Sequence, residues 1–197
     1  MKNAVSRAMV ERIPIYLDYL KKSNKSSVSA TVIAKDLSYG EVQVRKDLNY
    51  ISGAGRPRIG YQTNELIKDI EHFIGKDIPN KAVIVGAGKL GLALLEYDGF
   101  REFGVEITAA FDSEPKKSSK ATVYHAGELS DYCKENQVKI GIITVPAESA
   151  QEVCDEMVAS GITAIWNFAP ITLEVPQDIT VINEKLAISL SMLRQTL

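Results

Sequence analysis

Gly86-Ala87-Gly88-Lys89-Leu90-Gly91 follows an apolar run at 82–85 and precedes a helical pattern. Asp112 directly follows the next apolar run, 105–111, and lies 21 residues past the last glycine of the motif. This spacing is typical of a dinucleotide-binding βαβ unit, whose glycines allow a tight turn, close approach of a pyrophosphate and close packing of the helix. Asp112 is expected to accept a hydrogen bond from the adenosine ribose and to repel a 2′-phosphate, which favours NADH or NAD⁺ over NADPH or NADP⁺.

The pattern after Asp112 predicts a doubly wound α/β sheet, with helices near 127–136 and 149–159 and strands at 139–145, 162–168 and 179–182. Ligands of such sheets bind at the carboxyl ends of the strands, so the candidate nucleotide-binding residues follow those ends. They are Gly86, Ala87, Gly88, Lys89, Leu90, Gly91, Asp112, Thr144, Val145, Pro146, Asn167 and Phe168. Tyr97, at the end of the first helix of the unit, is a further candidate near the nicotinamide.

The first 77 residues show a different pattern. Helices are predicted at 8–20, 29–37 and 41–51, with Ser29 as the N-cap of the second and Pro14 near the first turn or at a kink of the first. A basic, glycine-rich loop at 52–61 and a helix at 63–74 follow. This order predicts a winged helix-turn-helix. Its candidate DNA-binding residues are Gln43, Arg45, Lys46, Arg56 and Arg58. Taken singly, each cation could be a solvated surface charge, but four at the two elements that touch DNA favour binding.

Charge is divided unevenly along the 197 residues, although the net charge is only −2. Residues 1–77 hold 13 Lys and Arg against 9 Asp and Glu, whereas residues 78–197 hold 10 against 16. A basic first module favours a polyanionic partner. With 45% hydrophobic residues and no apolar stretch long enough for a membrane span, a cytoplasmic protein is expected. Cys133 and Cys154 lack metal-ligand spacing and are predicted to be buried and structural.

The second half lacks obvious catalytic equipment. The two histidines, His72 and His125, lie away from the expected nicotinamide end, and no length remains for a substrate domain. No catalytic residue and no metal ligand is therefore assigned, and a small NAD-dependent oxidoreductase is the weaker alternative. The apolar stripe from Leu186 to Leu197 predicts a terminal helix that docks either on its own sheet or on a partner subunit.

Several stretches resemble the Rex family of bacterial redox-sensing repressors over nearly the whole chain. They are Gln43-Val44-Arg45-Lys46-Asp47-Leu48, the glycine motif with Ala93-Leu94 and Tyr97-Asp98-Gly99-Phe100, Phe111-Asp112-Ser113-Glu114-Pro115-Lys116, and Asn167-Phe168-Ala169-Pro170. The resemblance implies a homodimer that binds inverted-repeat operator DNA and is released from it by NADH. It also implies three parts: a winged-helix domain at 1–77, a Rossmann domain at 78–184 and a swapped dimerisation helix at 185–197.

Three segments of the chain depart from the family pattern. Arg56-Pro57-Arg58 stands where the family has Lys-Arg-Gly, Lys89 replaces an asparagine, and Ala187 replaces an aspartate. In the family that aspartate pairs with an arginine of the first helix, which corresponds to Arg12 here, in one state of the switch. Ala187 cannot form this pair, so weaker coupling between NADH and DNA is expected. A regulator of the same architecture that responds to another adenine nucleotide stays an alternative.

Overall fold

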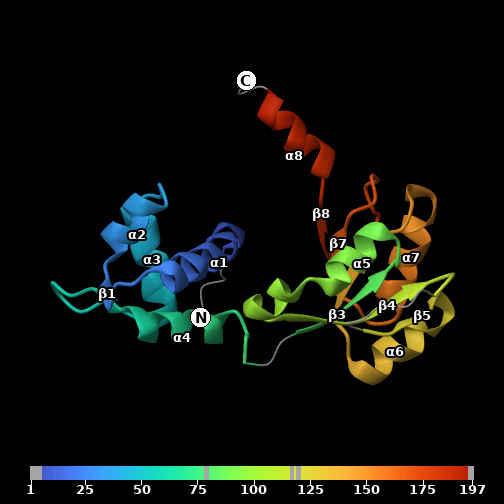
Figure 1. The fold of residues 1–197 in the computed structure, drawn as a ribbon, viewed down its shortest axis with the longest axis horizontal. Helices are drawn as coiled ribbons and strands as arrows, with labels where there is room; N and C mark the ends of the chain where they lie inside the picture. The colour runs from blue at the N-terminus through green and yellow to red at the C-terminus, as the bar shows by residue number, and fades with distance from the viewer. Residues whose placement is uncertain (1–5, 78–79, 116–117, 119–120, 195–197) are drawn as a thin grey trace. The chain divides into compact units, whose positions relative to one another are not determined.

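The computed structural model describes residues 6–77, 80–115, 118 and 121–194 (Figure 1). The chain forms two compact units, Met1–Ile78 and Pro79–Leu197. Each unit has a hydrophobic core of its own, one in the first and one on each face of a sheet in the second. The second unit includes the terminal helix.

The N-terminal unit packs its helices around one core and joins two of its loops by a short antiparallel sheet. Its elements are α1 (Arg7–Lys22), β1 (Ser27–Val28), α2 (Ala30–Asp36), α3 (Glu41–Ser52), β2 (Tyr61–Gln62) and α4 (Thr63–Phe73). The predicted N-cap is confirmed, because the Ser29 hydroxyl accepts a hydrogen bond from the Val32 amide at 3.2 Å. Pro14 lies inside α1, and the helix continues through it to Lys22.

Every helix of this unit contributes fully buried side chains to the core. They are Ile13, Tyr16, Leu17 and Leu20 of α1, Ile33 of α2, Val44 and Leu48 of α3, and Leu66 and Ile70 of α4. The i, i+3, i+4 and i+7 spacing of the α1 residues explains why this amphipathic segment forms a helix. The unit has the winged helix-turn-helix arrangement that was predicted, with α3 as the second helix of the motif and residues 53–60 as the wing.

The C-terminal unit contains a six-stranded parallel sheet in the order β5-β4-β3-β6-β7-β8. The strands are β3 (Asn80–Val85), β4 (Val105–Asp112), β5 (Val123–His125), β6 (Ile140–Ile143), β7 (Ala164–Asn167) and β8 (Thr180–Asn183). This is the strand order of a dinucleotide-binding Rossmann fold, in which the order of the strands reverses between the first and fourth strands. Here the reversal falls between β3 and β6, which are neighbours in the sheet.

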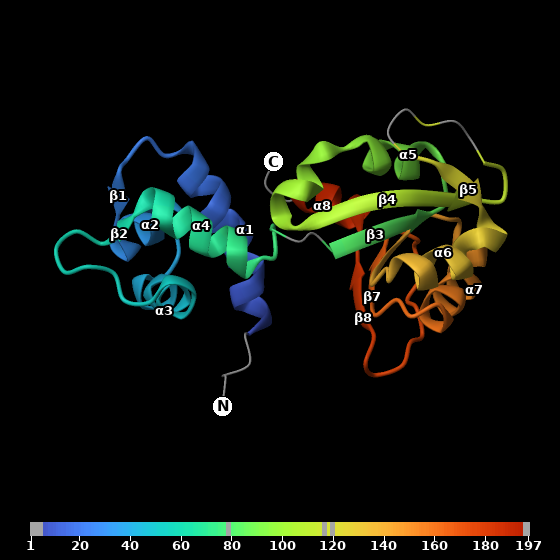
Figure 2. The ribbon, with the colours of Figure 1, turned by 90° about the horizontal axis from the view of Figure 1, so that it is seen from below.

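Helices cover both faces of this sheet, with α5 (Lys89–Glu96) on one side and α6 (Leu129–Asn136) and α7 (Ala147–Ala159) on the other (Figure 2). Two 3-10 helices, η1 (Asp98–Phe103) and η2 (Ala126–Glu128), complete the connections. Side chains alternate between two cores, so Ala82 and Ile84 face α5 whereas Val83 and Val85 face α6 and α7. Parallel strands that are buried on both faces are apolar, as is the buried part of β3, residues 82–85.

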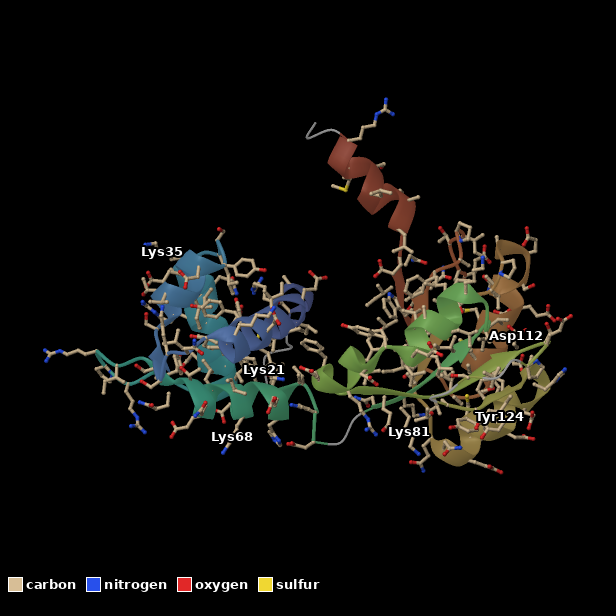
Figure 3. The ribbon with its side chains drawn as sticks, viewed as in Figure 1. Lys21, Lys35, Lys68, Lys81, Asp112 and Tyr124 are labelled. Atoms are coloured by element: carbon tan, nitrogen blue, oxygen red, sulfur yellow. The ribbon has the colours of Figure 1, made fainter. Side chains whose placement is uncertain are left out.

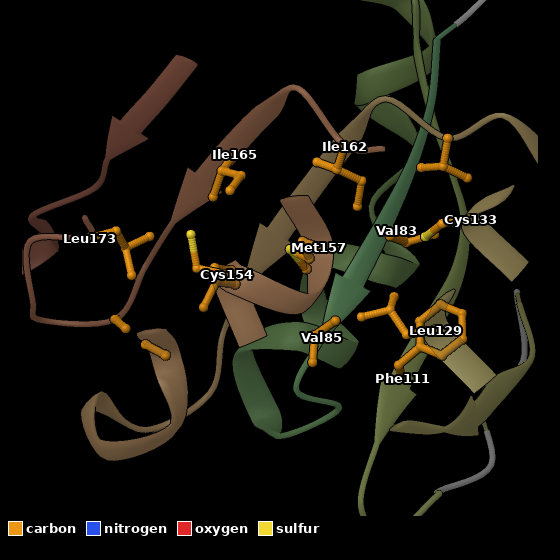
Figure 4. Packing of buried hydrophobic residues seen from close by; sticks show 14 of the residues in the cluster. Val83, Val85, Phe111, Leu129, Cys133, Cys154, Met157, Ile162, Ile165 and Leu173 are labelled. Carbon is orange, nitrogen blue, oxygen red and sulfur yellow. The ribbon is translucent and has the colours of Figure 1, made fainter. Parts of the chain in front are cut away.

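The two cysteines belong to the core beneath α6 and α7, where they pack with Phe111, Leu129 and Met157 (Figure 4). Both are free and buried, as predicted. Burial raises the pKa of the Cys133 thiol to about 11 and also raises the pKa of Cys154. Because the thiolate is the reactive form, burial of both thiols disfavours a redox role and favours the structural role that was predicted.

Several predicted boundaries shift by one or two residues, and two of these shifts have a clear physical reason. The strand expected at 139–145 ends at Ile143, because Thr144 turns its hydroxyl toward the carbonyl oxygens of Val85 and Gly86. The helix expected from residue 149 begins at Ala147, directly after Pro146 at the N-cap. The fixed φ of proline suits this position.

The terminal helix α8 (Leu186–Leu193) follows β8 (Figure 1). The side chains of Leu186, Ile188, Leu190 and Met192 are all more than half exposed, so within this chain the helix does not dock on its own sheet. Leu197, the last residue of the predicted stripe, lies outside the described residues.

Candidate functional site

The glycine loop joins β3 to α5 and is fixed by the end of β6. Gly86 has a φ of 104°, a conformation that L side chains rarely adopt, and a Cβ there would lie 2.8 Å from the Thr144 carbonyl carbon. The Thr144 hydroxyl donates to the Gly86 carbonyl oxygen at 2.7 Å and to the Val85 carbonyl oxygen at 3.2 Å. The loop is therefore held in place before any ligand arrives.

The remaining glycines of the motif differ in what surrounds them. A Cβ on Gly91 would lie 1.9 Å from the Gly86 carbonyl oxygen, so only glycine lets α5 pack this close to the loop. A Cβ on Gly88 would meet no atom within 4 Å. Gly88 is also the N-cap of α5 and offers no side chain to the first amides of the helix. The open space before these amides fits a pyrophosphate, which helix N-termini bind.

Asp112 ends β4 beside the glycine loop (Figure 3). Its Oδ2 accepts a hydrogen bond from the Ala87 amide at 2.6 Å, and its Oδ1 accepts from the Glu114 amide at 2.9 Å. The carboxylate therefore lies where the first two strands of a Rossmann unit place the acidic group that binds a ribose. Lys89 and Leu90 lie in the first turn of α5, and both are exposed.

The residues predicted after β6 and β7 do not share one role. Thr144 shapes the glycine loop, Val145 is half-buried and Pro146 is exposed at the start of α7. Asn167 is fully buried. Its amide nitrogen donates to the carbonyl oxygens of Ala169 and Ile171 and to Oδ1 of Asn183, and its amide oxygen accepts from the Ala169 amide. Asn167 therefore positions the loop after β7 and does not present its side chain to a ligand.

A row of aromatic rings follows the α5 face of the sheet. Tyr97, the C-cap of α5, contacts Phe100 with ring centroids 5.0 Å apart, Phe100 contacts Trp166 at 5.8 Å, and Trp166 contacts Phe168 at 4.5 Å. The row connects two predicted residues, Tyr97 and Phe168, through two that sequence reasoning missed. Sequence periodicity does not identify Phe100 and Trp166 as partners, because their rings come into contact only in the folded chain, where η1 lies near β7.

The carboxyl ends of β7 and β8 also border a hollow of about 560 Å³. It is lined by the loop 168–172 and by residues 183–188, which include Ala187 and the first turn of α8. The hollow lies at the same edge of the sheet as the glycine loop, since all strands are parallel. Ala187, which departs from the family pattern, therefore lies beside the end of the sheet where ligands bind in such folds.

In the N-terminal unit, α1 is joined to α3 by a buried ion pair. The Arg12 guanidinium donates to the two carboxylate oxygens of Asp47 at 2.7 and 3.1 Å, and the Tyr16 hydroxyl and the Gln43 amide donate to the same carboxylate. The hydrogen bond with Asp47 raises the pKa of Arg12, and burial raises the pKa of Tyr16. Sequence reasoning missed Asp47, although it lies between the buried Val44 and Leu48.

A groove of about 760 Å³ runs between α3, the start of α2 and the wing. The predicted Arg45, Lys46, Arg56 and Arg58 all line it, together with Val42 and Asn49 of α3. Arg45 also forms an exposed ion pair with Glu41, one turn earlier in α3. Gln43 does not line the groove, because its amide is directed to Asp47 at 2.8 Å. All four predicted cations therefore line the groove, whereas the predicted glutamine does not.

The wing ends in a tight turn, 56–59, in which the Ile59 amide donates to the Arg56 carbonyl oxygen at 3.2 Å. Arg58 occupies the third position with a φ of 64°, a left-handed conformation that favours glycine. Pro57 at the second position suits the turn. Gly60, with a φ of 82°, lets the wing pass the Val28 carbonyl oxygen, which a Cβ would approach to 2.3 Å.

Within the described ranges, no group of three His, Cys, Asp or Glu side chains is placed to hold a metal ion. His72 lies on the surface near Asp77, and His125 accepts a hydrogen bond from the Gly127 amide as part of a capping box. None of the helices that the structure describes is long and apolar enough to cross a membrane.

Comparison with known proteins agrees with this geometry. Residues 77–171 match the family described as CoA binding domain, and residues 4–49 match the putative DNA-binding protein N-terminus. A Bacteroides thetaiotaomicron protein named redox-sensing transcriptional repressor Rex is 39% identical over 196 residues, covering 96% of this chain and 89% of that protein. A Treponema denticola protein of the same name is 42% identical over 191 residues, covering 93% of this chain and 91% of the relative.

Two solved structures are also similar to this chain over nearly its whole length. A crystal structure of RSP in complex with β-NAD⁺ and operator DNA matches with a TM-score of 0.89 at 32% identity, covering 98% of this chain and 93% of that chain. The complex of RSP with β-NADH matches with a TM-score of 0.86, covering 98% of this chain and 94% of that chain.

A winged helix with a basic groove, joined to a Rossmann unit with a pre-shaped glycine loop, defines a DNA-binding regulator that responds to a nucleotide. The chain belongs to the Rex family of redox-sensing transcriptional repressors.

Proposed function

We propose that this chain is a dimeric transcriptional repressor that binds inverted-repeat operator DNA and is released from it by NADH. The observation that carries the proposal is the presence, on one chain, of an open pyrophosphate cradle at Gly88 and a cation-lined groove on a winged helix. RSP, which shares this fold, has been crystallised with β-NAD⁺ and operator DNA and with β-NADH.

The dinucleotide is held at the carboxyl edge of the sheet in this proposal. The amides at the start of α5 bind the pyrophosphate, and Asp112 accepts from the adenosine ribose. Lys89 adds a positive charge beside the phosphates. Tyr97 and Phe168 lie at the two ends of the aromatic row, where they sense the nicotinamide half, while Asn167 keeps the loop after β7 in shape.

DNA binding is assigned to the groove of the N-terminal unit. The α3 residues Arg45 and Lys46 enter the major groove, and the wing residues Arg56 and Arg58 contact the adjacent minor groove. Gln43 contributes indirectly, because it holds Asp47 and thereby the orientation of α3. A repressor of this kind acts in the cytoplasm, where it reaches its operator.

The exposed apolar side chains of α8 support the dimer. A helix this apolar is stable in water only when another surface covers it. We assign it to the partner subunit, so that residues 1–77 read DNA, residues 78–184 bind the nucleotide and residues 185–197 join the two copies. Two subunits related by a two-fold axis present two recognition helices to an inverted repeat.

Titration with NADH tests the proposal against the oxidoreductase alternative. Trp166, the single tryptophan of the chain, lies in the aromatic row, so its fluorescence should be quenched as NADH binds. We expect saturable quenching by NADH, little by NADPH and no consumption of the nucleotide over hours. Oxidation of NADH without an added partner enzyme would overturn the assignment as a regulator. Stronger competition by ADP than by NAD⁺ would point to an adenine-nucleotide sensor instead.

A further inference from the structure

One side chain on the DNA-facing surface of α3 is apolar. Val42, Arg45, Lys46 and Asn49 are spaced i, i+3, i+4 and i+7, so they share one face of the helix, and all four line the groove. The valine is 66% exposed, whereas Val44, two residues later, is completely buried in the core. The exposed valine therefore has no part in the core of its own unit.

The position of Val42 along the helix indicates what it meets. It is the second residue of α3, and the N-terminal residues of a recognition helix are those that contact base edges. The major groove presents hydrogen-bonding groups from every base pair, but its one apolar group is the C5-methyl of thymine. An exposed valine at this position gains only from that methyl group.

We propose that Val42 contacts a thymine methyl and thereby specifies thymine at one position of each half-site. The inference rests on the proposed DNA-binding function and deepens it. Val42 and Arg45 are about 4.5 Å apart along the helix axis, and base pairs are stacked about 3.4 Å apart. The specified thymine therefore lies one or two base pairs from the base that Arg45 reads.

A second exposed apolar side chain, Ile59, lines the same groove from the wing, so a protein partner could also cover the pair. The surrounding charges favour DNA. Arg45, Lys46, Arg56 and Arg58 all border the groove, which is the composition of a polyanion-binding surface and not of the apolar centre of a protein interface.

Replacement of thymine by deoxyuridine tests the proposal, because it removes the C5-methyl and nothing else. The full-length protein first selects its tightest duplex from a random pool, and each symmetric pair of thymines is then replaced in turn. For the parent protein we expect one pair whose replacement weakens binding by about 4-fold per half-site and about 15-fold for both, the effect of one buried methyl group. Val42→Ala should bind the unmodified duplex more weakly and should lose the difference between thymine and deoxyuridine at that pair alone.

Two variants serve as controls. Ile15, an apolar residue of α1 that is 43% exposed, lies outside the groove, so Ile15→Ala should keep the parental preference. Lys46→Ala should weaken binding to thymine and deoxyuridine duplexes equally. An equal effect of deoxyuridine on the parent protein and on Val42→Ala overturns the proposal, as does a parent protein indifferent to every replacement. Failure of the parent to select any duplex would instead overturn the DNA-binding function itself.

Discussion

At the scale of single residues, two glycines of one loop are required for different reasons. Gly88 has an ordinary φ of −71° and open space around it, so Gly88→Val should lower the free energy of unfolding by no more than about 1 kcal/mol, the cost of a poor N-cap residue. It should weaken NADH binding by about 10- to 100-fold, because the side chain occupies the place of the pyrophosphate and breaks charge-assisted hydrogen bonds.

Gly91→Val is the matched comparison, and it should destabilise the C-terminal unit by at least about 2 kcal/mol, because its Cβ would collide with the Gly86 carbonyl oxygen. Urea unfolding and NADH titration of both variants separate the two roles. Equal destabilisation by the two substitutions would contradict this account of the loop.

Asp112 carries the choice between cofactors. Asp112→Ala should weaken NADH binding by about 1 to 3 kcal/mol, because the ribose hydroxyl loses its hydrogen-bond acceptor. The variant should also discriminate less against NADPH, because the carboxylate that repels the 2′-phosphate is gone. Glu114→Ala removes an exposed charge two residues away and should leave both affinities unchanged. Parent protein that binds NADH and NADPH equally would show that Asp112 does not have this role.

Arg58 adopts a conformation that glycine would adopt without strain. Arg58→Gly should therefore raise the free energy of unfolding of the N-terminal unit by about 0.5 to 1 kcal/mol. It should nevertheless weaken operator binding and lower the slope of log affinity against log salt by about 0.9 per subunit, because one positive charge is removed from the DNA interface. Arg58→Lys, which keeps the charge, should keep the slope. A glycine variant with parental affinity and slope would remove the wing from the DNA interface.

The sequence identifies the glycine loop and Asp112 because a pyrophosphate and a ribose require particular residue types at particular spacings. It does not reveal that the side-chain amide of Asn167 forms its hydrogen bonds within the protein, because these bonds depend on Asn183 and on the path of the chain between β7 and β8. For the same reason the direction of the Gln43 side chain, toward Asp47 and away from the groove, could not be predicted. The DNA contacts of the four cations stay predictions.

At the scale of elements, the Arg12–Asp47 ion pair fixes α3 against α1. Asp47 is 2% exposed and accepts four hydrogen bonds. Asp47→Ala therefore leaves the Arg12 guanidinium largely shielded from water and without its carboxylate partner. We expect a loss of about 3 kcal/mol in the unfolding free energy of the N-terminal unit, typical of breaking a buried pair.

Asp18→Ala is the control, because Asp18 pairs with Lys22 on the exposed side of α1 and should contribute less than about 0.5 kcal/mol. Chemical unfolding followed by circular dichroism compares them. Similar losses in the two variants would mean that the buried pair is not what holds α3.

The order of the helices and strands could be predicted because hydrophobic periodicity, capping residues and glycines are local signals that agree on where each element lies. Their ends could not be predicted to the residue, since β6 stops where the Thr144 hydroxyl turns to the glycine loop, a contact between segments 58 residues apart in the sequence. The apolar stripe of α8 predicts docking either on its own sheet or on a partner subunit. The exposure of its apolar side chains excludes the first within this chain.

At the scale of the whole molecule, the response depends on how nucleotide binding changes the geometry that DNA requires. Arg12 is engaged by Asp47, and Ala187 lacks the carboxylate that the resemblance to the Rex family pairs with this arginine. Coupling between NADH and DNA should therefore fall short of the upper end of the usual range of about 1 to 3 kcal/mol, which corresponds to about 150-fold in affinity. Ala187→Asp supplies the carboxylate found in the family and should enlarge the effect of NADH on operator affinity. No change in that effect would show that coupling does not pass through Arg12.

Operator affinity measured at one salt concentration, without ligand, with NAD⁺ and with NADH, tests the central claim most directly. A ligand shifts the equilibrium only if it binds one state better, so the three conditions must differ if the chain is a redox sensor. We predict similar affinity without ligand and with NAD⁺, and a clear decrease with NADH that is smaller than about 100-fold. Equal affinity in all three conditions would contradict the account, and a decrease of more than about 100-fold would contradict the part assigned to Arg12 and Ala187.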